Sequence, residues 1–341
     1  MKLQLGLLLL GAGVAVNAQA VCTVSSSSGQ PVPHVFSIPD ITVNIDADAP
    51  ADTTNPVGFS NAVPQGYDIK FDQCRTGDLY GKSSINMPGP QGGAYIYPSN
   101  IPGIGIKILW NNGVDFSNGQ FPTTGTMDFS EEGGGTLGTW VYPANSFYRV
   151  EVYKTAETLN LTPQGQNIAL MPNDYAYNWV TSDSYANAGQ VLHLGTIQVN
   201  STPSCRFENS KMVDFGTVTG DMINGGLQVE RPLNFAITCR TDYGSYSSTA
   251  SLSSESASAD ASYIAVTDQS GAKDSLAIKV KDSAGNWLKL DGSSSETLSN
   301  LASNAPAEFH WTAALMSQPG VQKHPSEGDF TAHAEILLQV K

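Results

Sequence analysis

The sequence predicts an all-β protein built from two β-sandwich domains. The chain contains 33 Gly and 19 Pro, only 14% of its residues are charged, and long stretches with apolar residues at helical spacing are hard to find. Short β-branched and aromatic runs bounded by turn residues recur instead, which is typical of sandwiches and barrels. A length of 341 residues is typical of two domains.

The N-terminal residues predict export. Lys2 is followed by an apolar run over residues 3–16 and then by Ala18-Gln19-Ala20, the order found in secretory signal peptides. We therefore expect residues 1–20 to be removed, with Val21 as the new N-terminus. The alternative, a membrane anchor, is disfavoured because the run is too short to span a bilayer well. No second long apolar run follows, so we expect an exported protein without membrane insertion.

Charge and motifs exclude several classes of function. The formal net charge of −14 argues against nucleic acid and anionic membranes as partners. The five histidines are scattered, and neither H-E-x-x-H nor G-x-S-x-G occurs. We expect a protein that is not an enzyme and that uses no cofactor and no metal.

Four cysteines remain in the exported chain, and an even number predicts two disulfides. Three connectivities are possible. The long gap between Cys74 and Cys205 favours local pairing, Cys22 with Cys74 and Cys205 with Cys239. Metal binding is disfavoured because there is no C-x-x-C motif.

The first half alternates short strands with long polar loops. We expect strands at residues 35–45, 67–73, 94–97, 105–111, 126–130, 147–155, 177–181 and 191–199. The longest loops are expected at residues 46–61, 77–93, 111–124 and 182–190. Long loops on a rigid β scaffold are where binding surfaces are usually built.

A change of composition marks the domain boundary. The residues Asn-Ser-Thr-Pro-Ser at 200–204 are typical of a linker, which predicts a first domain over residues 21–199 and a second over residues 205–341. In the second half, we expect strands at residues 233–240, 276–281, 287–290, 309–315 and 330–340, with a weak one near residues 250–252.

The last of these strands has the clearest pattern in the chain. Its apolar residues fall on every second position, which is the period of a strand with one buried face. Because chain ends usually fray, we expect so regular a terminal strand to be a central part of a sheet. The alternating apolar residues are Phe330, Ala332, Ala334, Ile336, Leu338 and Val340.

The second half resembles the pilin domains of chaperone–usher fimbriae. Cys205 opens this region, the residues Val-Asp-Phe-Gly follow at 213–216, Cys239 ends a strand, and the alternating strand comes last. The resemblance covers roughly residues 203–341 and implies an incomplete immunoglobulin-like fold that lacks its seventh strand. One departure is that the chain ends in Val340-Lys341, whereas such domains commonly have an aromatic residue near the end.

The resemblance also implies a binding groove and its partners. A periplasmic chaperone would fill the groove first, and the N-terminal extension of the next fimbrial subunit would replace it, with an outer-membrane usher as a further partner. This is strand addition to an open sheet edge. The groove residues expected on the terminal strand are Phe330, Ala332, Ala334, Ile336 and Leu338.

The region ahead of Cys205 implies the role of the subunit. A whole β domain stands where a shaft subunit would carry its donor segment, and this architecture resembles the two-domain tip adhesins of type 1 and type 3 fimbriae. The first domain, of immunoglobulin-like or jelly-roll type, would then be lectin-like and bind a host glycan or matrix protein at the fimbrial tip. Two alternatives stay open: a tip initiator or adaptor that binds no receptor, and a secreted carbohydrate-active enzyme.

Candidate receptor-binding residues lie mostly in or beside the long loops. Aromatic faces stack on sugar rings while amides and carboxylates fix their hydroxyls, and residues 110–120 offer both kinds of group. The competing interpretations are a core tryptophan followed by an ordinary turn, solvated loop acids, and an arginine paired with Asp72 or Asp78. The candidates are Asp46, Asp48, Asp52, Arg75, Trp110, Asn111, Asn112, Asp115, Gln120, Trp140 and Tyr142.

Overall fold

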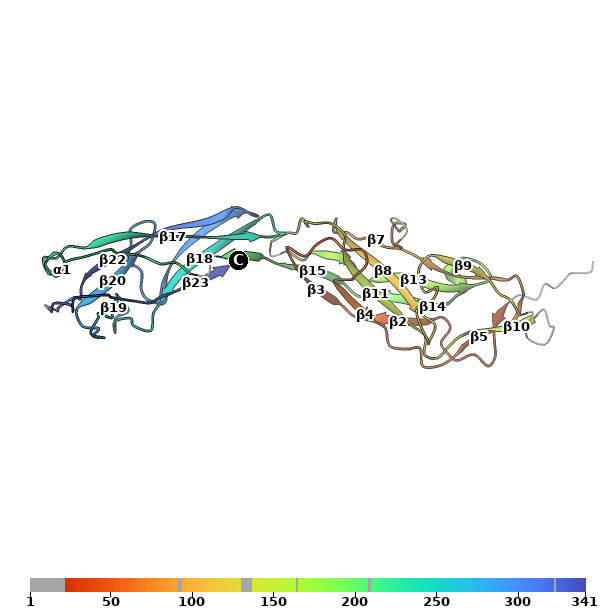
Figure 1. Cartoon of the computed structure of the whole chain (residues 1–341). Coiled ribbons are helices and arrows are strands. Elements are labelled where there is room, and N and C mark those ends of the chain that lie inside the picture. The colour runs from red at the N-terminus through yellow and green to blue at the C-terminus, as the bar shows by residue number, and fades with distance from the viewer. Residues whose placement is uncertain (1–21, 91–93, 130–136, 164, 208–209, 322) are drawn as a thin grey trace, which may run out of the picture.

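The computed structural model describes residues 22–90, 94–129, 137–163, 165–207, 210–321 and 323–341. The expected signal peptide and Val21 lie outside these residues. Within them, the only helical segments are the short turn η1 (Tyr185–Asn187) and the helix α1 (Gly220–Asn224), and the remaining regular structure is β-strand. The all-β prediction is therefore confirmed. Figure 1 shows two β-rich parts placed end to end.

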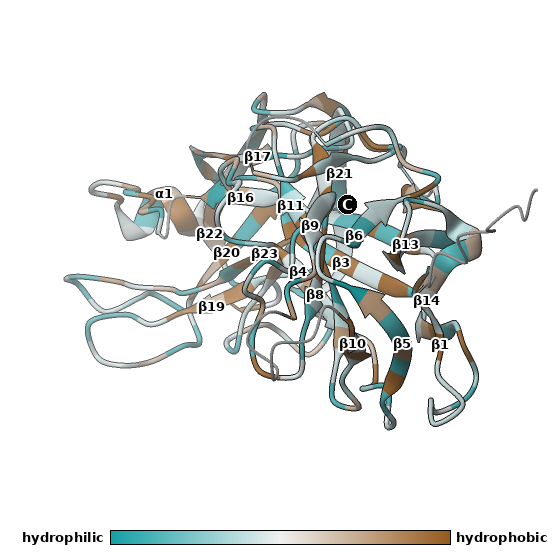
Figure 2. Ribbon diagram, turned by 90° about the vertical axis from the view of Figure 1, so that its right-hand side faces the viewer, coloured by the Kyte–Doolittle hydropathy of each residue, from teal (hydrophilic) through white to brown (hydrophobic). Residues whose placement is uncertain are grey.

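Four sheets build the first part. The largest, ordered β2-β14-β13-β6-β9, contains His34–Ile38, Ala188–Leu194, Asn173–Val180, Leu79–Ser84 and Thr123–Thr126. A second, ordered β4-β11-β8-β7, contains Gly58–Asn61, Phe147–Lys154, Ile104–Asn111 and Tyr97–Pro98. The sheet β1-β5-β10 contains Thr23–Val24, Ile69–Arg75 and Leu137–Tyr142, and the sheet β12-β15-β3 contains Ile168–Leu170, Ile197–Thr202 and Ile41–Asp46. Figure 2 shows hydrophobic and hydrophilic residues alternating along strands such as β5.

The core of the first part lies between sheets. Ile106 on β8 and Val150 on β11 are fully buried, and they pack in one cluster with Phe36 on β2 and Val199 on β15. Each buried side chain of this size stabilises the fold by about 1.5–3 kcal/mol. Because the cluster draws on the inner faces of several sheets, the first part is a β-sandwich.

Two expected strands are each divided by a change of sheet. Residues 35–45 form β2 and β3, which separate at Pro39 and Asp40, and residues 191–199 form parts of β14 and β15, which separate at Gly195. The two breaks lie side by side, because Gly195 N donates to Ile38 O at 2.8 Å and Thr196 N donates to the Asp40 carboxylate at 2.7 Å. A Cβ on Gly195 would lie 2.5 Å from that carboxylate, so the close approach requires glycine.

Strands also occupy stretches that the sequence pattern assigned to loops. Strand β4 lies within the expected loop 46–61, and β6 lies within the expected loop 77–93. In β6, Gly81 packs so closely on Trp179 that a Cβ would lie 2.4 Å from the indole ring. The expected strand 126–130 is also displaced, because β9 ends at Thr126 and Ser130 lies outside the described residues.

The second part is a sandwich of two sheets. The first, ordered β16-β17-β22-β20-β19, contains Ser204–Phe207, Val229–Arg240, Pro306–Ser317, Leu276–Lys281 and Ile264–Val266. The second, ordered β21-β18-β23, contains Asp291–Ala302, Ser245–Ser253 and Glu335–Val340. Phe235 and Trp311 of one sheet and Tyr246 and Leu252 of the other share a buried cluster. The expected strand 287–290 is absent, and Trp287 forms only an isolated bridge with Lys281.

Both disulfides have the pairing that the sequence favours. Cys22–Cys74 ties the N-terminal end of the described chain to β5, and Cys205–Cys239 joins the paired strands β16 and β17. Each sandwich therefore carries one covalent cross-link, which restricts its unfolded chain.

The residues expected to form a linker are held in strands. Asn200, Ser201 and Thr202 belong to β15, and Ser204 begins β16, so Pro203 alone separates the two strands. The loop after β17 also reaches the first part, where Leu159 N donates to the Asp242 carboxylate at 2.8 Å. The segment 200–204 is thus joined to its surroundings by hydrogen bonds on both sides of Pro203.

Candidate functional site

The terminal strand β23 lies at the edge of its sheet. It pairs antiparallel with β18, from Ser253 opposite Glu335 to Ser248 opposite Val340. Along its other edge, no strand pairs with it within the described part of the chain. The expectation of a central strand is therefore wrong: regular alternation gives one buried face, but it does not decide how many neighbours a strand has. An edge of this kind presents backbone N–H and C=O groups to an incoming strand.

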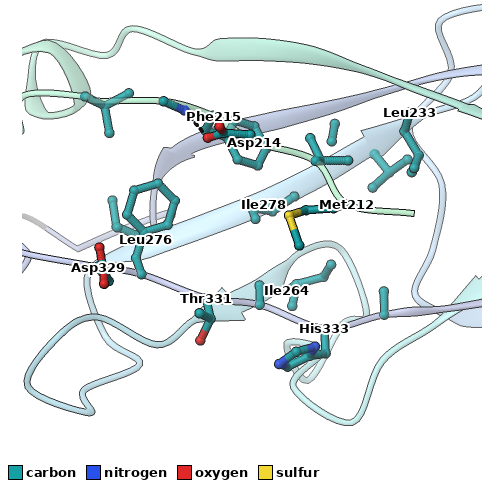
Figure 3. Close-up of a pocket in the computed structure, with 18 of the residues that line it drawn as sticks. Met212, Asp214, Phe215, Leu233, Ile264, Leu276, Ile278, Asp329, Thr331 and His333 are labelled. Atoms are coloured by element: carbon teal, nitrogen blue, oxygen red, sulfur yellow. Dashed lines mark hydrogen bonds between the residues drawn. The ribbon is translucent and has the colours of Figure 1, made fainter. Parts of the chain in front are cut away.

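A large groove lies beside this edge. Its volume is about 1690 Å³, which exceeds the range usual for small-molecule pockets. Figure 3 shows one wall carrying Met212 and Phe215 and the opposite wall carrying Thr331 and His333, with Ile278 on the strand that crosses between them. Much of the lining is apolar, so the groove suits an extended chain with apolar side chains.

Four of the five expected groove residues line this groove. Phe330, Ala332, Ala334 and Ile336 do so, and three of them are half-buried, while Ala334 is exposed. Leu338 packs half-buried against the core of the second sandwich and does not line the groove. Of the four lining residues only Ile336 belongs to β23, and the other three precede it. A contiguous apolar lining that is open to solvent marks an interaction site.

A second, smaller pocket lies in the first part. Its volume is about 360 Å³, and it gathers residues from four strands and from the loops that follow two of them. Trp110 is the penultimate residue of β8, Trp140 and Tyr142 lie on β10, and Asn112 belongs to the loop that follows β8. Four of the candidate receptor residues are therefore brought together.

The aromatic walls of this pocket pack on one another. The rings of Tyr80 and Trp140 have centroids 4.2 Å apart, and Tyr142 meets both Trp110 and Trp140 edge-on at 6.0 and 6.1 Å. Burial raises the pKa of Tyr142 well above its usual value, so its phenol stays neutral. The result is a rigid aromatic surface of the kind on which sugar rings stack.

A buried chain of amides fixes one polar group of the pocket. Gln65 Nε2 donates to the carbonyl oxygens of Tyr67 and Tyr142, which can only accept, so Gln65 Oε1 is an acceptor. Gln190 Nε2 therefore donates to Gln65 Oε1 at 2.7 Å, and Asn178 Nδ2 donates to Gln190 Oε1 at 2.8 Å. Within the part of the chain that the structure describes, Asn178 Oδ1 is left as an acceptor without a partner.

Lys82 is the charged group of this pocket. It lies on β6 opposite Asn178, is only 6% exposed, and its ammonium lies 5.5 Å from the centroid of the Trp110 ring. Within the described residues it forms no ion pair with a carboxylate. Burial lowers its pKa to about 8.

Comparison with known proteins identifies the second part. Residues 194–341 match the family model described as Fimbrial protein. The chain carries a fimbrial domain at its C-terminal end. The groove beside β23 therefore belongs to this fimbrial domain. No curated protein matches the sequence.

Several solved structures resemble the chain weakly. The CsuE tip subunit of Acinetobacter baumannii Csu pili, solved as a complex with CsuC, has 10% identity and a TM-score of 0.37, covering 91% of this chain and 99% of that chain. The CupB6 tip adhesin of Pseudomonas aeruginosa has 12% identity and a TM-score of 0.35, covering 86% and 92%. The receptor binding domain of MrkD1P from Klebsiella pneumoniae has 17% identity and a TM-score of 0.38, covering 53% and 96%. Such low TM-scores do not establish a shared fold.

Three other candidates from residues 110–120 lie outside the aromatic pocket. The side chain of Asn111 accepts a hydrogen bond from Gly113 N, and that of Asp115 accepts one from Ser117 N, both at 2.8 Å. Gln120 contributes its carbonyl oxygen to Thr123 Oγ1 at 2.6 Å. These contacts shape the turn that carries Asn112 into the pocket.

The remaining candidates are elsewhere in the molecule. Asp46 pairs with Thr202 at the end of β3, and Asp48 accepts a hydrogen bond from Ser204 Oγ at 2.6 Å, so both lie near the junction with the fimbrial domain. Asp52 accepts hydrogen bonds from Thr54 and Asn55 within its own loop. Arg75 ends β5 and does not line the pocket. The structure therefore does not bring these four residues to Trp110.

Lys82, Tyr80 and Asn178 are pocket residues that the sequence pattern did not indicate. In β6, Leu79, Gly81 and Ser83 alternate with Tyr80, Lys82 and Ser84, and neither set forms an apolar face. The usual period-two signal is therefore missing, although the strand lies inside a sheet.

Two further findings concern the described residues alone. No helix among them is long and apolar enough to cross a membrane. No group of three or more histidine, cysteine, aspartate or glutamate side chains among them has the arrangement of a metal site.

Proposed function

We propose that the chain is the tip adhesin of a chaperone–usher fimbria. The observation that carries this is the apolar groove of the fimbrial domain, which is lined by residues 324–337 and so extends onto the start of β23, a strand with an unpaired edge within the described residues. A donor strand from the next subunit would occupy it, with main-chain hydrogen bonds giving affinity and apolar contacts giving register. A periplasmic chaperone would occupy it before assembly, and an outer-membrane usher would receive that complex.

The part ahead of the fimbrial domain supports a place at the tip. The described residues before Pro203 form four sheets with their own core, so they are engaged in a fold and not free to enter a neighbour's groove. The aromatic pocket supports a receptor-binding role for this part over that of a non-binding adaptor or an enzyme. The receptor would be a host glycan or a matrix protein.

The groove is tested by co-expressing the full chain with a fimbrial periplasmic chaperone and isolating the complex by size-exclusion chromatography. Ile336→Asp places a charge in the groove and should abolish the complex. Gln339→Asp changes an exposed residue of the same strand and should leave it intact. Recovery of a normal complex with Ile336→Asp would contradict the proposal.

The receptor role is tested separately. The purified chaperone complex of the full chain is applied to arrays of glycans and matrix proteins, and we expect binding to at least one of them. Silence across both arrays would favour the adaptor. Release of free sugar from a glycan would favour the enzyme.

A further inference from the structure

Among the described residues, the positive charge of the aromatic pocket has no negative partner. Lys82 is almost fully buried, contacts the face of Trp110, and forms no ion pair within the described residues. Burying an ammonium is costly unless it is paired. The buried ammonium of Lys82 is therefore suited to bind the anionic group of a ligand.

The polar groups of the pocket differ in their access to solvent. Among the described residues, Trp110 Nε1 and Asn178 Oδ1 have no hydrogen-bond partner and almost no exposed surface, so a ligand in the pocket does not reach them. Lys82 Nζ also has no hydrogen bond to these residues but is not closed off in this way. The ammonium is therefore the polar group that is open to a ligand, and the ligand needs a negatively charged acceptor for it.

Shape narrows the class of ligand. A volume of about 360 Å³ lies at the low end of the range for small-molecule pockets and suits a single sugar ring. The walls of Trp110, Trp140 and Tyr80 offer flat apolar faces, against which the apolar face of a sugar can stack. An acidic peptide would need an extended groove, and a neutral sugar would leave the ammonium unpaired.

We propose that this pocket binds a carboxylate-bearing sugar, with its carboxylate on Lys82 and its ring against the two tryptophans. The inference rests on the proposed receptor-binding role and names the ligand class for it. The acidic surface of the whole protein would repel anions elsewhere, so the selectivity would be local.

The test is isothermal titration of the full chain, purified as its chaperone complex, with glucuronate and with N-acetylneuraminate. Glucose and the methyl ester of glucuronate serve as uncharged probes, and glucose 6-sulfate tests whether any anion suffices. We expect at least one carboxylate sugar to bind ~10-fold or more tightly than the uncharged probes, because charge-assisted hydrogen bonds are the strong ones. Equal binding of glucose and glucuronate, or no binding of either acid, would overturn the proposal, as would preference for the sulfate.

Variants of Lys82 distinguish a direct role in sugar binding from a general effect on folding. Lys82→Met should lower affinity for the acid ~10-fold or more, while Lys82→Arg should retain most of it. Lys70→Met is the matched control, because Lys70 lies outside the pocket beside Asp68, and it should bind as the wild type does. Unchanged binding by Lys82→Met would overturn the proposal. If the proposed fimbrial role is correct, the chaperone complex is recovered whether or not the sugar binds. Failure of the ligand proposal can therefore be distinguished from failure of the proposed fimbrial role.

Discussion

The carboxylate of Asp242 accepts a hydrogen bond from Ser201 Oγ at 2.7 Å and thereby joins the loop after β17 to the last strand of the first sandwich. Its other oxygen accepts from Leu159 N at 2.8 Å, and Asp242 is only 1% exposed. The adjacent Tyr243 accepts a hydrogen bond from Ser201 N through its hydroxyl oxygen at 2.9 Å. The junction is thus a hydrogen-bonded interface, in which the fimbrial domain reaches back to the first part.

Removing this carboxylate should loosen the junction. In Asp242→Ala, two buried donors lose their acceptor, and we expect the free energy of unfolding to fall by about 2–4 kcal/mol. Differential scanning calorimetry would measure the loss, and small-angle scattering would show a broader distribution of distances between the parts. Asp274→Ala is the control, because Asp274 pairs with Lys323 at an exposed site, and it should change stability by less than about 1 kcal/mol. Equal effects of the two substitutions would contradict this account of the junction.

Local composition predicted the fold class but not this junction. Asn, Ser, Thr and Pro at 200–204 are typical of a linker, yet the strand pairing of β15 with β3 extends to Thr202. That pairing depends on a parallel partner some 150 residues away in the sequence, which composition does not reveal. Local composition also does not show which sheet a strand joins. The breaks at Asp40 and Gly195 were therefore missed, because one apolar pattern runs through two strands that belong to different sheets.

The candidate pocket was predictable only in part. Trp110, Asn112, Trp140 and Tyr142 were indicated because aromatic residues beside amides suit sugars, and the structure gathers all four. Lys82 was not indicated, since it is buried by residues from other strands, among them Trp110 and Asn178, and not through any local pattern. The acids at 46, 48 and 52 have suitable chemistry for a sugar, but the topology places them elsewhere.

Enlarging Gly81 should disrupt the sheet that carries Lys82. In Gly81→Ala the new Cβ would lie 2.4 Å from the Trp179 ring and 2.6 Å from Thr123 O. We expect the free energy of unfolding to fall by about 2–3 kcal/mol because a close-packed interior resists added volume. Gly89→Ala is matched, since a Cβ there meets nothing within 4 Å, and should change stability by less than about 0.5 kcal/mol. Urea denaturation followed by tryptophan fluorescence would measure both, and an undisturbed Gly81→Ala would show that β6 is packed differently.

Supplying a strand to the open edge should stabilise the fimbrial domain. The C-terminus lies beside Ser247, which pairs with Lys341. A strand of alternating isoleucine and serine, fused there through a short turn containing glycine, could therefore run back along β23. Burial of its apolar side chains in the groove should raise the free energy of unfolding by at least about 3 kcal/mol. The fusion should also no longer bind the chaperone, whereas a fused strand with serine at every position should leave both properties unchanged.

Lys82 should lower the stability of the protein at neutral pH. Its pKa falls from 10.5 to about 8 on folding, which corresponds to about 3 kcal/mol of disfavoured charge, and contact with Trp110 returns about 1 kcal/mol. At pH 7 the free energy of unfolding of Lys82→Met should therefore be about 2 kcal/mol higher than that of the wild type. The variant should at the same time bind the acidic sugar more weakly. A residue kept only for structure would show the opposite effect.

The pH dependence of that difference gives the sharper measurement. Below about pH 8 Lys82 is protonated in both the folded and the unfolded chain, so the advantage of Lys82→Met is constant. Between pH 8 and 10.5 the unfolded chain binds more protons at Lys82 than the folded chain does, so the wild type gains stability as pH rises and the advantage shrinks. Tyr80 and Tyr142, which also face the pocket, are present in both proteins. The difference in free energy of unfolding between the wild type and Lys82→Met therefore reports on Lys82. Urea unfolding of both proteins from pH 6.5 to 10 would measure it, and an advantage that does not shrink would show that the Lys82 ammonium is not disfavoured by burial.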